Sequence, residues 1–325
     1  GDDDLGFDQR HDLKGSWRNG LGGSSGYNTG LYRPASRFMM RRLLSCLFLC
    51  LLPLVADAIE PPRPKIGLVL SGGAARGLAH IGVLKALEEQ GIQIDAIAGT
   101  SMGAVIGGLY ASGYKIDELE KLALSIDWQQ ALSDAPPRED VPFRRKQDDR
   151  DFLVKQKLSF RDDGSLGLPL GVLPGQNLAL LLESMFAHSS NTRNFDKLPI
   201  PFRAVATDIT TGEKVVFRKG HLPQVIRASM SIPAVFAPVE LDGRLLVDGG
   251  MTDNIPLDVA REMGVDIAIV VDIGTPLRSR KQLATVVDVL NQSITLMTRR
   301  NSEEQLKDLH PKDVLIQPPL AAYGV

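Results

Sequence analysis

The stretch Gly99-Thr100-Ser101-Met102-Gly103 lies at the junction of two apolar segments of this chain. The segment before it, Ile94 to Ala98, predicts a buried strand. The segment after it, Met102 to Ala111, is rich in small residues and predicts a helix packed closely on a sheet. Ser101 is therefore expected on a tight turn from strand to helix, with the flanking glycines leaving room for the turn. This is the geometry of a nucleophile elbow, although G-x-S-x-G also occurs by chance in unrelated turns.

A glycine-containing loop precedes the elbow by one helix and one strand. Lys65 to Leu70 predicts a strand, Ser71-Gly72-Gly73-Ala74-Ala75-Arg76-Gly77 the loop, and Leu78 to Gln90 an amphipathic helix. Such a loop presents backbone N–H groups to an anion, which can be a nucleotide phosphate, a lipid phosphate or the oxyanion of acyl transfer. The phosphate-loop patterns are not spelled here. The oxyanion fits best, because adjacent parallel strands bring the loop and the elbow to one sheet edge. Arg76 stabilises the loop or nearby negative charge, or simply caps a surface turn.

The third stretch is Asp248-Gly249-Gly250, which follows the apolar strand expected over Arg244 to Val247. Asp242-Gly243 before that strand predicts a hairpin turn. Asp248 on its own can be an ordinary turn or capping aspartate. Together with the two earlier stretches it completes a set of nucleophile, oxyanion loop and base.

These three stretches resemble the signature motifs of the patatin-like phospholipase family, and Ala228 to Pro238 resembles the segment that this family places before its aspartate. The resemblance covers Lys65 to Gln317. The chain departs from the family pattern in the first motif. The family often has Asp-Gly-Gly-Gly there, whereas in this chain Ser71 replaces the aspartate and Ala74 replaces the third glycine. Ala74 still carries an N–H, so the oxyanion site is expected to survive if its backbone dihedrals allow it.

The resemblance implies a lipid acyl hydrolase that needs no cofactor and no metal and uses a Ser-Asp dyad without histidine. Its partners would be a phospholipid or fatty-acyl ester and a membrane surface, and it leaves a homodimer open. Carried onto the matching positions, it assigns Ser101 as nucleophile, Asp248 as general base, Gly99 and Gly103 to the elbow, and Gly72, Gly73 and Ala74 as oxyanion donors with Arg76 beside them.

The resemblance also implies an α/β fold of three layers, in which helices flank a doubly wound, mostly parallel sheet. The stripe in Lys115 to Ile126 predicts a core-facing helix, with a lid or membrane-surface helix as the alternative. The triplet Arg144-Arg145-Lys146 predicts a solvated loop or a contact with anionic headgroups. Further strands are expected over 151–160, 201–208, 214–217, 266–273 and 313–317, and further helices over 175–188, 222–229, 256–263 and 281–309.

The N-terminal part predicts export. Arg41-Arg42, the apolar run Leu43 to Val55 and Ala56-Asp57-Ala58 have the order of a signal peptide, and the run is short for a membrane span. We therefore expect a non-native or disordered leader over residues 1–38, a signal peptide over 39–58, and a single catalytic domain over 59–325 with its core at about 65–317.

A signal peptide followed by such a domain resembles the secreted patatin passenger of bacterial type V autotransporters, in which an outer-membrane barrel follows the lipase. That resemblance implies secretion, or a place on the cell surface or outer membrane of a Gram-negative bacterium, with a barrel downstream. Cys46 and Cys50, the two cysteines of the chain, lie inside the apolar run, so the mature domain is expected to lack disulfides.

Composition excludes little else. The chain of 325 residues is 43% hydrophobic and 23% charged, and its formal net charge of −2 gives no support for nucleic-acid binding. Three other functions stay open: an esterase with the triad Ser101, Asp272 and His310, a lipid acyltransferase, and a secreted lipid-binding module whose catalytic site is vestigial. His80 is expected to be packed against the core, whereas His188 and His221 lie at the ends of predicted elements.

Overall fold

The computed structural model describes residues 63–134, 139, 142–143, 159–160, 166–167 and 173–320. The chain divides into two units, Gly1–Pro62 and Arg63–Val325, and the described strands, helices and cavity belong to the second. The predicted leader, the signal peptide and the basic triplet at 144–146 lie outside the described residues. So does most of the strand expected over 151–160, of which β3 (Ser159–Phe160) pairs antiparallel with β4 (Leu166–Gly167).

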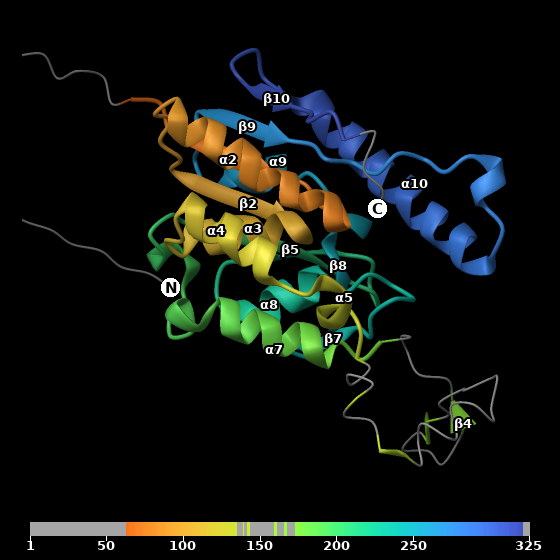
Figure 1. The fold of residues 1–325 in the computed structure, drawn as a ribbon. Helices are drawn as coiled ribbons and strands as arrows, with labels where there is room; N and C mark the ends of the chain where they lie inside the picture. Colours follow the sequence, from red (N-terminus) through yellow and green to blue (C-terminus); the bar gives the residue numbers. More distant parts are fainter. Residues whose placement is uncertain are drawn as a thin grey trace, which may run out of the picture. The chain divides into compact units, whose positions relative to one another are not determined.

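An eight-stranded mixed sheet forms the centre of the described unit, in the order β10-β9-β1-β2-β5-β8-β7, with β6 paired to β5 (Figure 1). The first five strands of this order are parallel, and β8 and β6 run antiparallel to β5. The prediction of a mostly parallel α/β sheet is confirmed. The strands are β1 (Ile66–Leu70), β2 (Ala96–Thr100), β5 (Phe202–Asp208), β6 (Lys214–Phe217), β7 (Val239–Leu241), β8 (Arg244–Asp248), β9 (Ile267–Val271) and β10 (Val314–Ile316).

The register of the sheet brings the three motifs to one place. Leu70 at the end of β1 pairs with Gly99, so the glycine loop and the elbow leave the same edge. One strand further, Thr100 pairs with Val205 of β5, and the next residue of β5, Ala206, pairs with Asp248. Because β8 is antiparallel to β5, it ends level with the end of β2. Asp248 therefore lies across β5 from the elbow.

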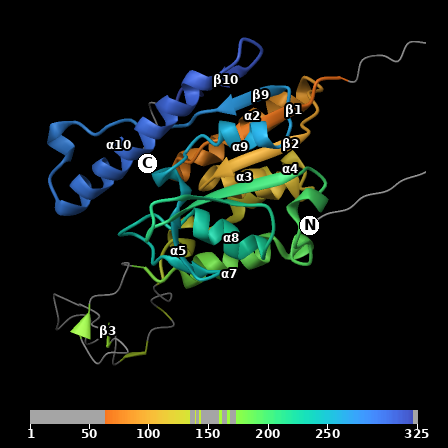
Figure 2. The same cartoon turned by 180° about the vertical axis from the view of Figure 1, so that it is seen from behind.

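Helices cover both faces of the sheet (Figures 1 and 2). Leu68 and Leu70 of β1 belong to one buried cluster with side chains of α2, α3, α4, α7 and α8, whereas Val69 belongs to a second cluster with α9. This alternation along one strand is what a sheet buried on both faces requires. The helices are α2 (Ala79–Glu89), α3 (Met102–Ala111), α4 (Ile116–Ser125), α5 (Trp128–Ala131), α7 (Gln176–Met185), α8 (Leu222–Ser229), α9 (Leu257–Glu262) and α10 (Val286–Gln305).

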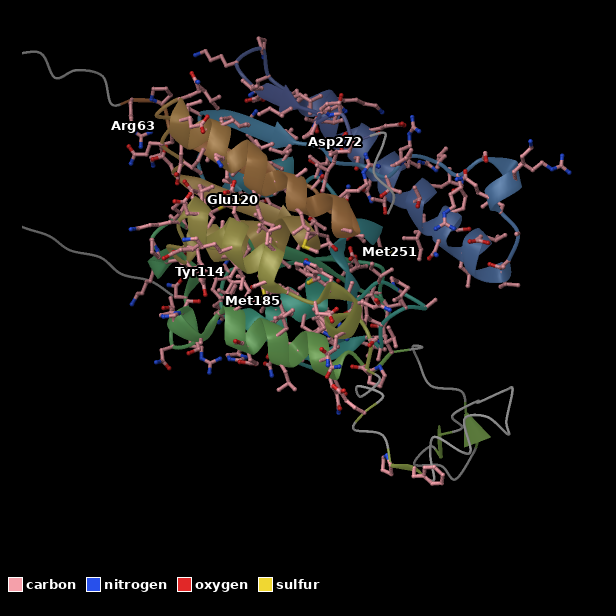
Figure 3. The ribbon with its side chains drawn as sticks, in the orientation of Figure 1. Arg63, Tyr114, Glu120, Met185, Met251 and Asp272 are labelled. Carbon is pink, nitrogen blue, oxygen red and sulfur yellow. The ribbon has the colours of Figure 1, made fainter. Side chains whose placement is uncertain are left out.

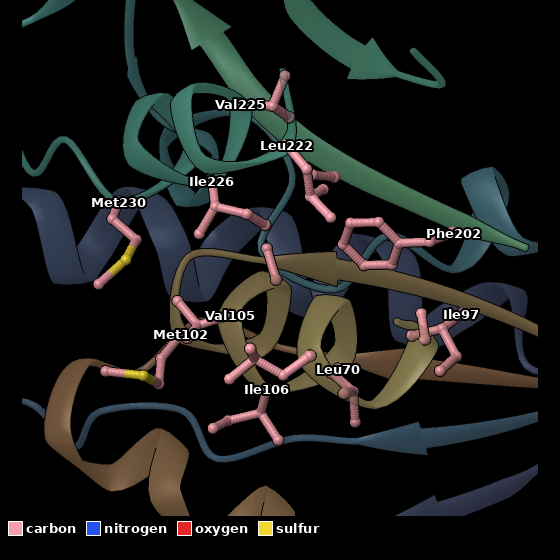
Figure 4. Close-up of a cluster of buried hydrophobic side chains, with 14 of the residues drawn as sticks. Leu70, Ile97, Met102, Val105, Ile106, Phe202, Leu222, Val225, Ile226 and Met230 are labelled. Carbon is pink, nitrogen blue, oxygen red and sulfur yellow. The ribbon is translucent and has the colours of Figure 1, made fainter. Parts of the chain in front are cut away.

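Helix α3 is enclosed by the larger cluster, which explains its small and apolar sequence. Figure 4 shows Val105 and Ile106 of α3 near Leu70 and Ile97 of the sheet and Ile226 of α8. The 3-10 turns that link the main elements are η1 (Ala74–Leu78), η2 (Ala187–Ser189), η3 (Phe195–Lys197), η4 (Gly249–Met251), η5 (Arg280–Gln282) and η6 (Leu306–Asp308).

One of these helices differs from its predicted bounds, and another keeps its predicted core-facing stripe. The long helix expected over 281–309 begins only at Val286, because Thr285 and Asp288 form a capping box that fixes its start. In α4 and its C-cap, the predicted stripe faces the core: Ile116 and Leu119 are buried, and Leu122 and Ile126 pack against the same cluster. Leu124, which is not part of that stripe, is 87% exposed. In the described part of the chain, no helix has the length and apolar character needed to cross a membrane.

Candidate active site

Ser101 follows β2 directly and caps the N-terminus of α3, with backbone dihedrals φ 53° and ψ −123°. A non-glycine residue in such a region costs of the order of 1–3 kcal/mol and persists only where the surroundings impose it. Here the start of α3 presses against two strand ends. A Cβ on Gly103 would lie 2.3 Å from the carbonyl oxygen of Leu70, and one on Gly99 would lie 2.6 Å from that of Gly103. This close approach accounts for both elbow glycines.

The structure brings Ser101 and Asp248 into direct contact. The Ser101 hydroxyl donates a hydrogen bond of 2.7 Å to Oδ2 of Asp248, across 147 positions of sequence. The other carboxylate oxygen accepts the Gly250 N–H at 2.8 Å. Both side chains are buried, with Ser101 5% and Asp248 8% exposed. The carboxylate is thus held with one oxygen fixed by the glycine turn and the other directed at the hydroxyl.

Burial raises the pKa of Asp248 to about 6, while the hydrogen bonds from Ser101 and Gly250 lower it. The raised pKa makes this carboxylate a stronger base than an aspartate in water. It still leaves the group mostly ionised at neutral pH, the state in which a general base accepts a proton.

The glycine loop presents two N–H groups beside the dyad. Ala74 has φ 48°, a left-handed conformation that its Cβ tolerates at some cost. Among the described residues, the N–H groups of Gly73 and Ala74 have no hydrogen-bond acceptor. Gly72 departs from the prediction, because its N–H donates to the carbonyl oxygen of Asn254 at 3.3 Å. Of the three backbone donors that the sequence predicts for an oxyanion, two are free in the described structure.

Arg76 lies on the loop side of the same site. Its Nε and Nη1 atoms are buried and have no hydrogen-bond partner among the residues that the structure describes. Buried N–H donors without an acceptor are costly, so these two nitrogens are suited to meet a negative charge that arrives with a ligand.

The dyad, the glycine loop and Arg76 line one cavity of about 890 Å³. Its volume lies within the range of small-molecule sites. Met251 and Asp272 also line it, and both are labelled in Figure 3. Of the predicted site residues, the cavity is lined by Ser101, Asp248, Gly72, Gly73, Ala74 and Arg76.

Helix α10 forms one wall of the cavity and is tied to the glycine turn after Asp248. Asn301 donates to the Gly250 carbonyl at 2.8 Å and accepts the Asn254 N–H at 3.0 Å. The Asn254 side chain donates to the Ser302 hydroxyl at 3.2 Å. No local sequence pattern points to these residues, because their partners lie in a distant helix.

Among the described residues, no histidine completes a triad with Ser101. Asp272 lines the cavity, but its carboxylate accepts the Gly274 N–H and the Gln317 amide, each at 2.9 Å. His310 is exposed, does not line the cavity, and donates its backbone N–H to Asp313. The Ser101, Asp272 and His310 alternative therefore does not assemble.

His80 is fully buried, as expected, with Nε2 2.8 Å from the Ser71 carbonyl oxygen. Burial lowers the pKa of His80 to about 4, so it is neutral at pH 7. His188 packs edge-on against Tyr114, and His221 lies 3.4 Å from Glu183. Each of the three has a structural contact of its own.

A partly buried group of one lysine and two aspartates lies next to the elbow residue Thr100. Lys214 contacts Asp253 at 2.9 Å and also contacts Asp258, and the Thr100 hydroxyl donates to the Asp253 carbonyl oxygen. Burial raises the pKa of Asp253 to about 7.

In the part of the chain that the structure describes, no group of three or more His, Cys, Asp and Glu side chains is placed to hold a metal ion.

Comparisons with known proteins find several proteins that resemble this chain in sequence. An uncharacterized NTE family protein of Mycobacterium tuberculosis is 36% identical over 210 residues, which are 65% of this chain and 49% of the relative. Human patatin-like phospholipase domain-containing protein 6 is 34% identical over 247 residues, 73% of this chain and 15% of that protein. The chain thus matches less than half the length of these relatives. A solved structure, VipD from Legionella pneumophila, shares 19% identity over 79% of this chain and 61% of its own, with a TM-score of 0.43.

The family model described as patatin-like phospholipase matches residues 68–261, a span that includes the glycine loop, the elbow and the Asp248 turn. This span is more than half of the chain, and within it the structure joins the three motifs around one cavity. The chain belongs to the patatin-like phospholipase family.

Proposed function

We propose that this chain is a serine lipid acyl hydrolase of the phospholipase A type, which cleaves acyl esters of phospholipids. The observation that carries the proposal is the 2.7 Å hydrogen bond from the Ser101 hydroxyl to Asp248 inside the cavity. Membership in the patatin-like phospholipase family supports a lipid ester as substrate.

In the acylation step, Asp248 accepts the hydroxyl proton while Ser101 Oγ attacks the ester carbonyl carbon. The carbonyl oxygen becomes an oxyanion, and the N–H groups of Gly73 and Ala74 are its proposed donors. When the tetrahedral intermediate collapses, the bond to the alcohol oxygen breaks, and Asp248 returns its proton to that oxygen. The products are a lysophospholipid and an acyl group bound to Ser101.

In the deacylation step, a water molecule takes the place of the departed alcohol. Asp248 accepts a proton from this water as its oxygen attacks the acyl carbon, and the same two N–H groups hold the second oxyanion. Collapse of this intermediate breaks the bond to Ser101 Oγ, which regains its proton from Asp248. A fatty acid leaves, and the dyad is restored.

The proposal is tested by incubating the purified chain with a phospholipid that carries different acyl chains at sn-1 and sn-2. Mass spectrometry should find a free fatty acid and the matching lysophospholipid in equal amounts, and their identities give the position cleaved. An acyl ester of added glycerol as the main product would identify an acyltransferase instead. Absence of turnover on every ester tested would favour a lipid-binding module.

We further propose that the outer side of α10 contacts the membrane surface from which the substrate comes. While Ile294, Thr298 and Ser302 of this helix line the cavity, several apolar side chains on its other sides are exposed. Arg280 and Lys281, just before the helix, are exposed as well and suit anionic headgroups. The exposed apolar residues of α10, between 45% and 77% exposed, are Val286, Val289, Leu290, Leu296 and Met297.

Leu296→Glu is expected to lower hydrolysis of phospholipid vesicles by about tenfold and to leave hydrolysis of a soluble short-chain ester unchanged. Burying a leucine in an apolar phase is worth about 1.5–3 kcal/mol, and 1.4 kcal/mol is tenfold in partition. The measurement is a comparison of initial rates on the two substrates. Leu124→Glu, on the exposed side of α4 away from the cavity, is the matched control. An equal loss on both substrates, or in both variants, would contradict the membrane contact.

Export stays a proposal that rests on the signal-peptide pattern of residues 39–58. When the gene is expressed in a Gram-negative host, the N-terminal residue of the exported product is expected to be Ile59. N-terminal sequencing of the periplasmic and outer-membrane fractions tests this, and a product that retains residues 39–58 would contradict it. The proposed downstream barrel is tested by reading the gene beyond the codon for Val325.

A further inference from the structure

The hydroxyl of Ser229, the last residue of α8, bridges the elbow and the central strand. It accepts the backbone N–H of Ser101 at 2.9 Å and donates to the Val205 carbonyl of β5 at 2.6 Å. The Ser229 side chain is fully buried, and Ser229 does not line the cavity. It therefore contacts the nucleophile from behind, through the backbone, without reaching a substrate.

Ser101 depends on such a contact because of its backbone conformation. At φ 53° and ψ −123° it occupies a strained region at the N-terminus of α3, where the first N–H groups of a helix have no partner within the helix. Leaving the buried N–H of Ser101 without an acceptor costs about 1–3 kcal/mol. A rotation of the Ser101 peptide would relieve that cost, but it would also move Oγ away from Asp248.

The same short segment holds the base. The carbonyl oxygen of Ser231 accepts the backbone N–H of Asp248 at 2.9 Å. Ser231 is itself fixed, because its hydroxyl accepts from the Arg227 guanidinium at 2.6 Å and donates to the Arg227 carbonyl at 2.9 Å. Residues 229–231, at the end of α8 and just after it, thus make one hydrogen bond to the backbone of the nucleophile and one to the backbone of the base.

We propose that Ser229 is a positioning residue, whose hydroxyl holds the Ser101 backbone in the conformation that keeps Oγ 2.7 Å from Asp248. The Ser229 hydroxyl proton is directed at the Val205 carbonyl oxygen, so the Ser229 hydroxyl gives and takes no proton in the reaction. Because the Ser101 N–H donates to Ser229, it is not free for the oxyanion, which is left to the N–H groups of the glycine loop. This inference rests on the proposed function, in which Ser101 and Asp248 react.

The test compares Ser229→Ala with Ser229→Thr, which keeps a hydroxyl, and with Ser189→Ala. Ser189 is 6% exposed and donates to the Phe186 carbonyl at 3.2 Å, away from the cavity, so it is a buried serine of matched chemistry. The three readouts are Tm, the separate kcat and KM values on a soluble ester, and the rate at which a fluorophosphonate labels Ser101.

Ser229→Ala is expected to lower kcat and the labelling rate by about 10²-fold with KM within twofold, because a misplacement of about 1 Å at the reacting atom acts on this scale. Ser229→Thr should recover most of kcat and of the labelling rate. Ser189→Ala should keep both at the wild-type values, even if its Tm falls. Wild-type rates in Ser229→Ala would overturn the inference. So would an equal loss of rate in Ser229→Ala and Ser189→Ala when the two variants have the same Tm.

The labelling rate separates this inference from the proposed function. If the wild type hydrolyses no ester, but Ser101 is labelled and Ser229→Ala slows that labelling, the hydrolase proposal fails and the positioning role stands. A wild-type Ser101 that neither reacts with the fluorophosphonate nor turns over an ester would overturn both.

Discussion

Ser101→Ala is expected to reduce phospholipid turnover by about 10⁶-fold, the scale on which removal of a catalytic serine acts. The Oγ of Ser101 is the atom that would carry the acyl group, and it donates the hydrogen bond to Asp248. Without this oxygen, water must attack the ester directly, and Asp248 with the two loop N–H groups gives only residual catalysis. The measurement is the rate of fatty-acid release from the same phospholipid under identical conditions.

The control for this variant is Ser112→Ala, at the other end of the same helix. Ser112 caps the C-terminus of α3 and donates to the Gly108 carbonyl at 2.7 Å, without lining the cavity. It should keep turnover near the wild-type rate while removing a serine hydroxyl from the same element. Substantial turnover in folded Ser101→Ala would exclude Ser101 as the nucleophile.

Asp248→Asn is expected to lower kcat/KM by about 10³-fold, within the 10²–10⁴-fold range that general-base catalysis contributes. The amide has nearly the shape of the carboxylate and can still accept a hydrogen bond from Ser101. It cannot take the proton as the serine attacks. The measurement is kcat/KM on a soluble ester at pH 8, with His310→Ala beside it as the variant that removes the rival base and should retain full activity. The opposite pattern, an active Asp248→Asn and an inactive His310→Ala, would mean that the base is wrongly assigned.

The raised pKa of Asp248 predicts two pH dependences. Because the carboxylate must be ionised to act as a base, wild-type kcat/KM should rise with pH through about 6 and level off above it. In the unfolded chain the pKa of an aspartate is about 3.9, so the folded state holds the proton more tightly between pH 4 and 6. The contribution of Asp248 to stability is therefore full below pH 4 and is lost as pH rises through 6, by up to about 3 kcal/mol.

Comparing wild type with Asp248→Asn isolates this effect, since other titrating groups such as Asp253 are present in both proteins. The free energy of unfolding of the variant, relative to that of wild type, should increase between pH 4 and pH 7. Urea unfolding at the two pH values measures it. A constant difference would mean that the pKa of Asp248 is not raised in the folded protein.

Much of the fold is predictable because parallel strands buried on both faces are almost uninterrupted apolar runs. The strands β1, β2 and β9 are each such an apolar run, and a glycine or an aspartate lies near the end of each run. The position of Ser101 between a strand and a small-residue helix was predictable for the same local reason. So was the turn at Asp248, which follows a hairpin signal.

The pairing that joins these motifs could not be derived from local patterns. Nothing near Asp248 shows that β8 lies beside β5, yet this pairing places the carboxylate opposite Ala206, next to the partner of Thr100. The state of single N–H groups is equally non-local. Gly72 is lost as a free donor because of a carbonyl at Asn254, and Ser101 is held by a hydroxyl 128 positions away.

The start of α10 shows a different limit. The periodic pattern continues back to Lys281, but the side chains of Thr285 and Asp288 compete for the backbone N–H groups and fix the helix start later. The residues between β9 and α10 thereby become part of the cavity wall, where Gly274, Thr275 and Arg278 lie. A capping box inside a longer periodic segment decides this boundary, and periodicity alone does not reveal it.

Trapping the acyl-enzyme tests the central claim most directly. The chain would be mixed with a phospholipid and quenched in acid within milliseconds, and its peptides would be analysed by mass spectrometry. We expect an acyl adduct on Ser101 that forms and decays at rates matching turnover and is absent from Ser101→Ala. An adduct on another residue, or turnover in wild type with an adduct that forms more slowly than product appears, would contradict the Ser101 and Asp248 dyad.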